Sequence, residues 1–266
     1  MVLLIAALAG LGIGTLGTLI GAGGGFVIVP LLVLLEPQWS TDQVTAFSLA
    51  VVTANASVGA LSYWRQGRVD PFSFPLYTLA AIPGSILGAF ATAYVPRAFF
   101  DPIFGAVLIA IGFWLFVRPG SSDAGGHTGY FQRVLVERGG RRYEWSFDPR
   151  IGFAGSTAVG FFSSLLGIGG GIIHVPLLAT VLGFPAHVAT ATSHAVLAVT
   201  AGIATVVHIL RGDYRATWPL VAAVAGGAAA GAPLGARLSA FVPGAVILRI
   251  LAAALGFVGL RLLFVR

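Results

Sequence analysis

The strongest constraint on the fold of this chain is a glycine-rich stretch that occurs twice. Residues 16–35 read LGTLIGAGGGFVIVPLLVLL and residues 162–182 read FSSLLGIGGGIIHVPLLATVL, so the G-x-G-G-G run and the following Pro-Leu-Leu return at an offset of 146 residues. Each glycine destabilises a helix by roughly 1 kcal/mol relative to alanine. In hydrocarbon, such a break survives only where it is buried in protein or lines a cavity. We therefore expect a duplicated chain with the two breaks at its functional centre.

The sequence around the breaks is that of a membrane protein. Of the 266 residues, 57% are hydrophobic and 9% are charged, whereas the charged fraction of soluble domains is about 25%. Apolar windows of about 20 residues, each long enough to cross a bilayer as a helix, recur along the chain. We predict an all-α polytopic fold of about eight spans: 2–20, 44–64, 74–95, 99–117, 151–166, 188–210, 218–241 and 245–265.

The predicted domains are two related halves, residues 1–117 and 151–266, which form pseudo-symmetric repeats. Each half also carries a short apolar segment after its glycine break, 26–35 and 172–182, that is too short to span. The first short helix begins either at Gly25, in which case Pro30 kinks it, or at Pro30, where proline suits the first helical position. The sequence leaves both possibilities open.

A hydrophilic loop, residues 118–150, joins the halves. Its first part reads as a flexible linker, whereas residues 131–147 alternate apolar and charged side chains around Gly139 and Gly140, which predicts a β-hairpin with a primed turn. We expect this hairpin to lie against the membrane as a connector, with a regulatory role as the alternative.

The charges indicate topology. All 15 basic residues are arginine and the net charge is +6, which arginines near span ends explain through the positive-inside rule; we expect no nucleic-acid partner. If each glycine-broken pair makes one crossing, the halves are parallel and 12 arginines share one side; if both members cross, the halves are inverted and 10 do. This count favours parallel halves, with the turns at 65–70 and 211–215 on the side of the central loop.

The glycine breaks are candidate anion sites. A helix that restarts after a break points its free N–H groups and the positive end of its dipole into the break. We therefore expect two such ends to bind an anion together, although packing is the other common use of glycine in membrane helices. The candidate residues are Gly23, Gly24, Gly25, Gly169, Gly170 and Gly171.

Polar residues follow one face of two equivalent spans. Ser48 and Asn55 lie at helical spacing in the first span, and Ser193 and His194 lie in the second. They are candidates to complete the coordination of an oxyanion, the alternative being hydrogen bonds between helices. His174 and His194 are also candidate proton relays because histidine titrates near neutral pH, and Arg237 either contacts the substrate or extends to the membrane surface.

Other chemistries find less support. The chain contains no cysteine, which excludes disulfides and thiolate metal sites. It also has no H-E-x-x-H pair and no nucleotide-binding motif. We expect no catalytic residue, no metal and no cofactor. A membrane-embedded enzyme that uses its histidines and a non-transporting assembly partner remain the alternative functions.

Several motifs together resemble the sulfite exporter TauE/SafE family. They are the two glycine-rich stretches with Pro-Leu-Leu, the Ala-x-Ser of residues 46–48 and 191–193, the turns at Arg65 and Arg211, and GAPLGARL at residues 231–238. The resemblance covers nearly the whole chain except the loop 118–150. It implies a multi-pass transporter of the cell inner (cytoplasmic) membrane that moves sulfite, sulfonates, sulfoacetate or another small anion, coupled to an ion gradient. The cargo, the direction, the coupling ion and the oligomeric state stay open.

Overall fold

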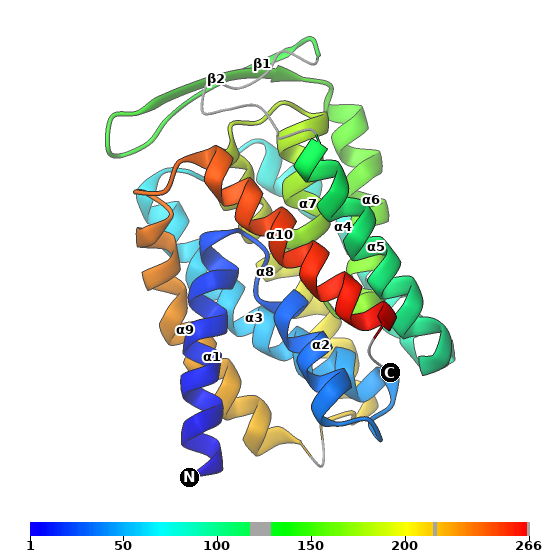
Figure 1. Cartoon of the computed structure of the whole chain (residues 1–266). Coiled ribbons are helices and arrows are strands. Elements are labelled where there is room, and N and C mark those ends of the chain that lie inside the picture. The colour runs from blue at the N-terminus through cyan, green and yellow to red at the C-terminus, as the bar shows by residue number, and fades with distance from the viewer. Residues whose placement is uncertain (118–128, 215–216, 265–266) are drawn as a thin grey trace.

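The computed structural model describes residues 1–117, 129–214 and 217–264 of the chain. They form a bundle of helices that carries a two-stranded β-hairpin across one end (Figure 1). The helices of the first half are α1 (Val2–Leu19), α2 (Gly25–Leu35), α3 (Thr41–Gln66), α4 (Ser73–Ala91), a 3₁₀ turn (Thr92–Tyr94) and α5 (Arg97–Val117). The second half has α6 (Pro149–Leu166), α7 (Gly171–Pro176), a π-helical turn (Leu177–Val181), α8 (Ala186–Arg211), α9 (Trp218–Leu238) and α10 (Gly244–Phe264).

The glycine breaks lie where the sequence places them. Each break has three glycines with positive φ, a conformation that costs other residues roughly 1–2 kcal/mol, and no other residue type adopts it among the described residues. These glycines are Gly21, Gly23 and Gly24 in the first break and Gly167, Gly169 and Gly170 in the second. Gly25 begins α2, with Pro30 inside the helix, which settles the choice left open above. In the second copy Pro176 ends α7, and the π-helical turn follows.

Each glycine-broken pair doubles back on itself. Helix α1 runs parallel to α9, because Gly10 lies against Val224 and Gly14 against Ala228. After the break the chain descends: Gly23 contacts Val52, near the middle of α3, and α2 ends at Leu35, just before α3 begins. Figure 1 shows α1 and α2 as two arms that start and end at the same end of the bundle. The pair α6 and α7 has the same form at the hairpin end.

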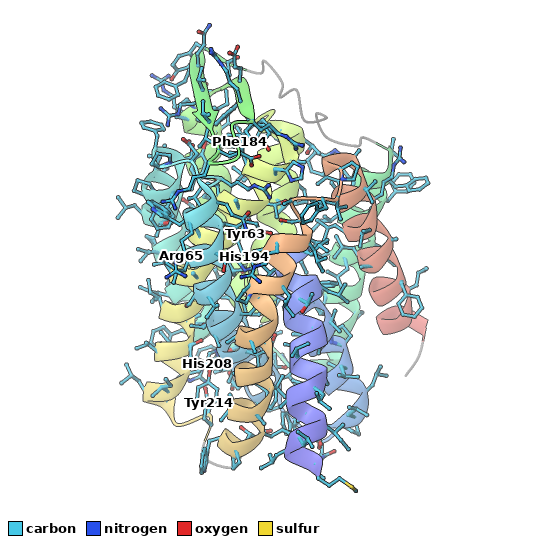
Figure 2. The ribbon with its side chains drawn as sticks, turned by 90° about the vertical axis from the view of Figure 1, so that its left-hand side faces the viewer. Tyr63, Arg65, Phe184, His194, His208 and Tyr214 are labelled. Carbon is cyan, nitrogen blue, oxygen red and sulfur yellow. The ribbon has the colours of Figure 1, made fainter. Side chains whose placement is uncertain are left out.

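This doubling back contradicts one prediction. The turn after α3 lies beside the β-hairpin, where Arg68 Nε is 2.7 Å from Glu137 Oε2. The turn after α8 lies at the opposite end, where Arg211 Nη2 is 3.1 Å from Asp42 Oδ2 at the start of α3. Figure 2 shows Phe184 near the hairpin and Tyr214 far from it. The prediction that the two turns share one side is therefore wrong, because it counted each glycine-broken pair as one net crossing.

Helices from the two halves pack against each other in matching pairs. Helix α1 packs on α9 and α6 on α4, while α3 packs on α8 and α5 on α10. The first two pairs are held by close approach at glycine: Gly84 of α4 lies against Thr157 of α6, as Gly231 of α9 lies against Leu11 of α1. Small residues of this kind let helix backbones approach in lipid, where hydrophobic burial adds little.

In the described part of the chain, five helices are long and apolar enough to cross a membrane, namely α1, α3, α4 with its 3₁₀ turn, α8 and α9. The apolar parts of α2, α5, α10 and the segment Gly171–Val181 are shorter. A largely helical, multi-pass membrane fold is therefore confirmed, whereas the expected number of eight spans is not established by these lengths.

The central hairpin is confirmed and packs on the bundle. Strands β1 (Phe131–Val136) and β2 (Arg142–Phe147) pair antiparallel, from Phe131 with Phe147 to Val136 with Arg142. The inward face of β2 is fully buried, and the Trp145 and Phe147 rings lie 5.0 and 4.9 Å from the ring of Phe184 in the loop before α8. The hairpin thus covers this end of the bundle instead of only linking the halves.

The arrangement of the ends is testable because the chain has no cysteine. We expect Arg65→Cys and Gly139→Cys to react with an impermeant maleimide from one side of the membrane, and Thr217→Cys to react from the other, since residue 217 lies at the end of the bundle away from the hairpin. The measurement is labelling of intact cells or oriented vesicles, with labelling after permeabilisation as the control. Labelling of positions 65 and 217 from one side would contradict the doubled-back arrangement.

Candidate functional site

The two glycine breaks meet in the middle of the bundle. A Cβ on Gly25 would lie 2.7 Å from the carbonyl oxygen of Ile168 in the second break, and a Cβ on Gly171 would collide with the carbonyl of Gly21 in the first. The backbones of the two breaks therefore touch, and a side chain at either position would separate them. The prediction that the fold brings the breaks together at its centre holds in this geometry.

Two equivalent side chains seal the meeting point. Val52 of α3 and Leu197 of α8 both lie against Gly23 and Gly169, and both are almost completely buried. One side chain comes from each half, so each break is closed by residues of both halves.

The breaks present backbone donors. In the first break the N–H groups of Ala22 and Gly23 bond the carbonyl of Gly17, which caps α1. Beyond them, within the described part of the chain, the N–H groups of Gly24 and Gly25 have no acceptor. The same is true of Gly169, Gly170, Gly171 and Ile172 in the second break. Such orphan donors at a helix start are the usual ligands of a bound anion.

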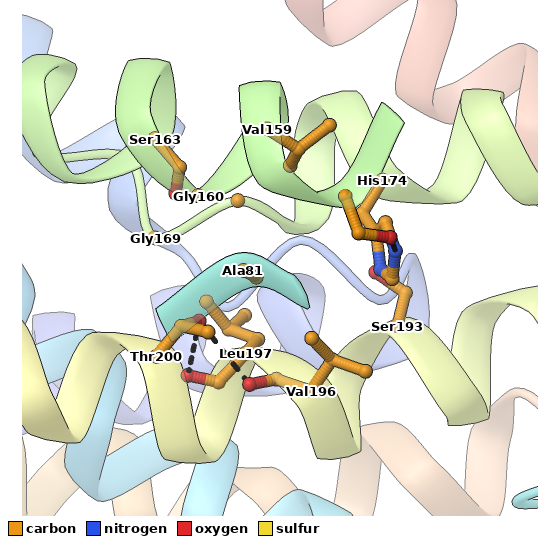
Figure 3. Close-up of a pocket in the computed structure, with 12 residues that line it drawn as sticks. Ala81, Val159, Gly160, Ser163, Gly169, His174, Ser193, Val196, Leu197 and Thr200 are labelled. Carbon is orange, nitrogen blue, oxygen red and sulfur yellow. Dashed lines mark hydrogen bonds between the residues drawn. The ribbon is translucent and has the colours of Figure 1, made fainter. Parts of the chain in front are cut away.

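A cavity lies beside the second break (Figure 3). Its wall is formed by α6, α8, the break itself and single residues of α4 and α7: Ala81, Ser156, Val159, Gly160, Ser163, Gly169, Gly170, His174, Ser193, Val196, Leu197 and Thr200. These residues include no carboxylate, arginine or lysine, and His174 is the one titratable side chain among them. The cavity volume is about 10 Å³, room for about one water molecule, so this is a closed form of the site.

Polar atoms at the cavity lack partners. The hydroxyl of Ser193 and Nδ1 of His174 are buried and have no hydrogen-bond partner in the described part of the chain. The other ring nitrogen of His174, Nε2, is 3.0 Å from the hydroxyl of Ser156. A buried polar group without a partner costs about 1–3 kcal/mol. The cavity therefore offers a hydroxyl and an imidazole nitrogen beside the unpaired N–H groups of Gly169 and Gly170.

The first break is surrounded by a different cluster. Asn55 Nδ2 donates to the carbonyls of Gly14 at 2.9 Å and Ala228 at 3.0 Å, and its Oδ1 accepts from the hydroxyl of Thr18 at 3.1 Å. The same hydroxyl lies 3.5 Å from Nε2 of His194. Both amide hydrogens of Asn55 are thus used within the protein, so Asn55 joins α1, α3 and α9 and has no hydrogen left for a ligand.

The remaining candidates lie apart from one another. Ser48 of α3 is fully buried, and its hydroxyl has no partner among the described residues. The Nδ1 atom of His194 is likewise unpartnered, and the ring stands edge-on to Tyr63 at 5.8 Å. Arg237 is exposed in the last turn of α9 and does not line the cavity.

Sequence reasoning missed Ser156 and Ser163, which line the cavity. A signal for them exists in the duplication: at the offset of 146 residues, Gly10 corresponds to Ser156 and Gly17 to Ser163. Helix α6 thus carries four hydroxyl residues, Ser156, Thr157, Ser163 and Ser164, where α1 carries two, Thr15 and Thr18. Comparing the copies position by position would have pointed to the second break as the more polar one.

The chain matches the family model for the sulfite exporter TauE/SafE over residues 6–262. It belongs to that family. It is 31% identical to the probable membrane transporter protein YunE of Bacillus subtilis over 99% of this chain and 98% of the relative. A probable membrane transporter protein of Haemophilus influenzae is 27% identical over 61% of this chain and 56% of its own length, and one of Methanocaldococcus jannaschii is 25% identical over 71% and 65%. No solved structure matches the chain. This TauE/SafE chain is accordingly a multi-pass membrane protein of a transporter family.

Contact between the breaks can be tested with alanine. We expect Gly25→Ala and Gly171→Ala each to lower the melting temperature of detergent-purified protein, because the added Cβ meets backbone that cannot move aside and such overpacking costs about 1–3 kcal/mol. Gly12→Ala is the matched control, since nothing lies within 4 Å of a Cβ there. Equal melting temperatures for all three variants would show that the breaks do not touch.

Proposed function

We propose that this TauE/SafE protein is a secondary transporter that moves a small sulfur-containing or organic anion, such as sulfite, a sulfonate or sulfoacetate, across the cytoplasmic membrane. The observation that carries the proposal is the second break, where unpaired N–H groups, the Ser193 hydroxyl and His174 face one cavity. These groups include no carboxylate to repel an anion. Uncharged donors suit a transported anion, because they bind it without a permanent positive charge. The anion can therefore also be released.

We further propose that the two halves are inverted repeats of four spans and one short doubled-back helix each. The matching helix pairs support this, since α1 with α9 corresponds to α6 with α4, and α3 with α8 is its own counterpart. The first glycine-broken pair enters from the end away from the hairpin and the second enters from the hairpin end, as inverted repeats require. Many secondary transporters are built in this way, with the cargo bound between the repeats near the midplane.

The arginines indicate which end faces the cytoplasm. Eight described arginines lie in the hairpin or in the helix ends beside it, namely Arg65, Arg68, Arg133, Arg138, Arg141, Arg142, Arg150 and Arg237. Among the described residues, the opposite end has Arg97 at the start of α5, Arg211 at the end of α8 and Arg261 near the end of α10. By the positive-inside rule the hairpin end is cytoplasmic.

The closed cavity fits an alternating-access mechanism. A cargo larger than water enters only when one end opens, so the helices around the break must move apart at the hairpin end or at the other end. The contact of Val52 and Leu197 with both breaks would separate the two routes throughout. Asn55 and His194 both contact Thr18, which precedes the first break, and Gly23 to Gly25 and Gly169 to Gly171 form the crossing. Ser48 stays a candidate donor to the cargo, and His174 and His194 stay the proton-relay candidates.

Counterflow in proteoliposomes tests the proposal. Vesicles loaded with unlabelled sulfite or sulfoacetate should accumulate the same radiolabelled anion transiently, whereas empty liposomes should not. Ser193→Ala should raise the apparent KM for the exchanging anion roughly fivefold, because one donor worth about 1 kcal/mol is lost. Ser57→Ala is the matched control, since that serine is on the exposed face of α3. Absence of exchange for both anions, or an unchanged KM in Ser193→Ala, would overturn the proposed cargo class or site.

A further inference from the structure

A second cluster of ionisable groups lies at the end of the bundle away from the hairpin. His208, in the last turns of α8, is completely buried, and its Nδ1 lies 2.7 Å from Oδ2 of Asp213 in the turn after the helix. Arg211 of the same helix lies 3.1 Å from Asp42 of α3 and 3.7 Å from Asp213. The cluster lies well away from the glycine breaks, and Figure 2 shows His208 and Tyr214 together near this end.

The cluster ties elements of both halves together. Arg211 Nη1 donates to the carbonyl of Ala89 at 3.2 Å and lies 3.4 Å from the hydroxyl of Thr92, which in turn donates to Asp42. Tyr214 donates to the carbonyl of Ala46 at 2.8 Å. Burial raises the pKa of the Tyr214 phenol, so this group stays a neutral donor. Together these bonds fasten the start of α3 and the end of α4 to the end of α8, and so close this end of the bundle.

The charges in the cluster balance only when His208 is protonated. Asp42 and Asp213 carry two negative charges and Arg211 carries one positive charge. When the His208 imidazole is neutral, the carboxylates of Asp42 and Asp213 compete for the guanidinium of Arg211. A closer contact between Asp213 and Arg211 then weakens the ion pair between Arg211 and Asp42. With an imidazolium, Asp213 has its own cation and Arg211 is left to Asp42. The described groups that face His208 are Asp213 and Tyr214 in the turn, Asp42 on α3 and Arg211 on α8.

We propose that His208 binds the proton that drives transport and that its protonation controls the bond between Asp42 and Arg211 that closes this end. The inference rests on the proposed transport function. His208 exchanges its proton with the water at this end through Asp213, whose side chain is 16% exposed. Loss of the proton weakens the closure, and binding of a proton restores it. His174 and His194 face hydroxyl groups, whereas His208 faces the carboxylate of Asp213.

A divalent metal is the competing occupant. One ligand atom each from Asp42, His208 and Asp213 lie within 4.8 Å of one another, a spacing that a metal ion would also accept. The guanidinium of Arg211 already bridges the two carboxylates, however, and would have to leave. The geometry therefore favours the proton over the metal.

Coupled and uncoupled fluxes separate the roles of the histidines. In proteoliposomes, His208→Gln should keep counterflow of sulfite or sulfoacetate but reduce accumulation driven by an imposed pH gradient by about tenfold or more. Asp213→Asn should do the same with the imidazole intact, and it serves as the second variant if His208→Gln does not fold. His187→Gln is the matched control, because it changes a buried histidine at the other end of the same helix. Driven accumulation that persists in both variants at the wild-type level would overturn the inference, whereas absence of counterflow in the wild type would count against the proposed function alone.

A second experiment needs no cargo. Ala46 is fully buried beneath Tyr214, so a cysteine at this position should react with an impermeant maleimide only when this end opens. We expect Ala46→Cys to react about fivefold faster near pH 8 than near pH 6, after correction for the reactivity of a free thiol, and His208→Gln to remove this difference. The same pH dependence with and without His208 would refute the proton site. A pH dependence that EDTA abolishes and Zn²⁺ restores would assign the cluster to a metal and refute it as well.

Discussion

The contact between the two glycine breaks is the feature on which the rest of the structure depends. Gly25 and Gly171 bring backbone against backbone, which only a residue without a Cβ allows. Because the breaks touch, α1 and α6 must stop near the middle of the bundle and their partners must turn back. The side chains of Val52 on α3 and Leu197 on α8 then pack directly against the two breaks. A side chain at the crossing would displace both halves at once, so the glycine pattern constrains the whole fold through one point.

Much of this was predictable from the sequence. The duplication located both breaks, because no other residue type suits three positive φ angles in a row of five, and the alternating pattern around Gly139 located the hairpin. The direction of the chain after each break was not predictable. It depends on contacts such as Gly10 with Val224 and Gly14 with Ala228, which set α1 parallel to α9. The distribution of arginines led to the wrong topology, because each side's count depended on an assumed number of crossings for the glycine-broken pairs.

The site shows a similar limit. A polar residue in a span reveals that it needs a partner, but it does not reveal which one. Asn55 finds its partners in Gly14, Ala228 and Thr18, so its polarity joins helices. Ser193 finds none and faces the cavity. Whether a polar side chain such as Asn55 or Ser193 finds a partner depends on helices that are close in space but distant in the chain. The local sequence around each residue does not show this.

The two halves differ in the polar residues around their breaks. Around the first break, Asn55 accepts from the Thr18 hydroxyl and donates to the carbonyls of Gly14 and Ala228. Around the second, serines replace two glycines of the first copy, and a cavity with unpaired donors remains. Both breaks keep unpaired backbone N–H groups, but unpaired side-chain groups face a cavity at the second break. Two identical, fully polar breaks would leave twice as many buried donors unpaired whenever the site is empty, at about 1–3 kcal/mol for each.

The ends of the bundle are held by ion pairs and the middle by apolar contact, a division that suits the alternating access proposed above. Arg68 with Glu137 and Arg133 with Asp70 hold the hairpin over one end, and Arg211 with Asp42 holds the other. A buried ion pair gives up hydration that roughly offsets its attraction, so opening an end returns charges to water at little net cost. Opening the contact of Val52 and Leu197 would instead expose apolar surface, which is unfavourable in proportion to its area. The chemistry of the contacts therefore makes the ends easy to open and keeps the centre shut.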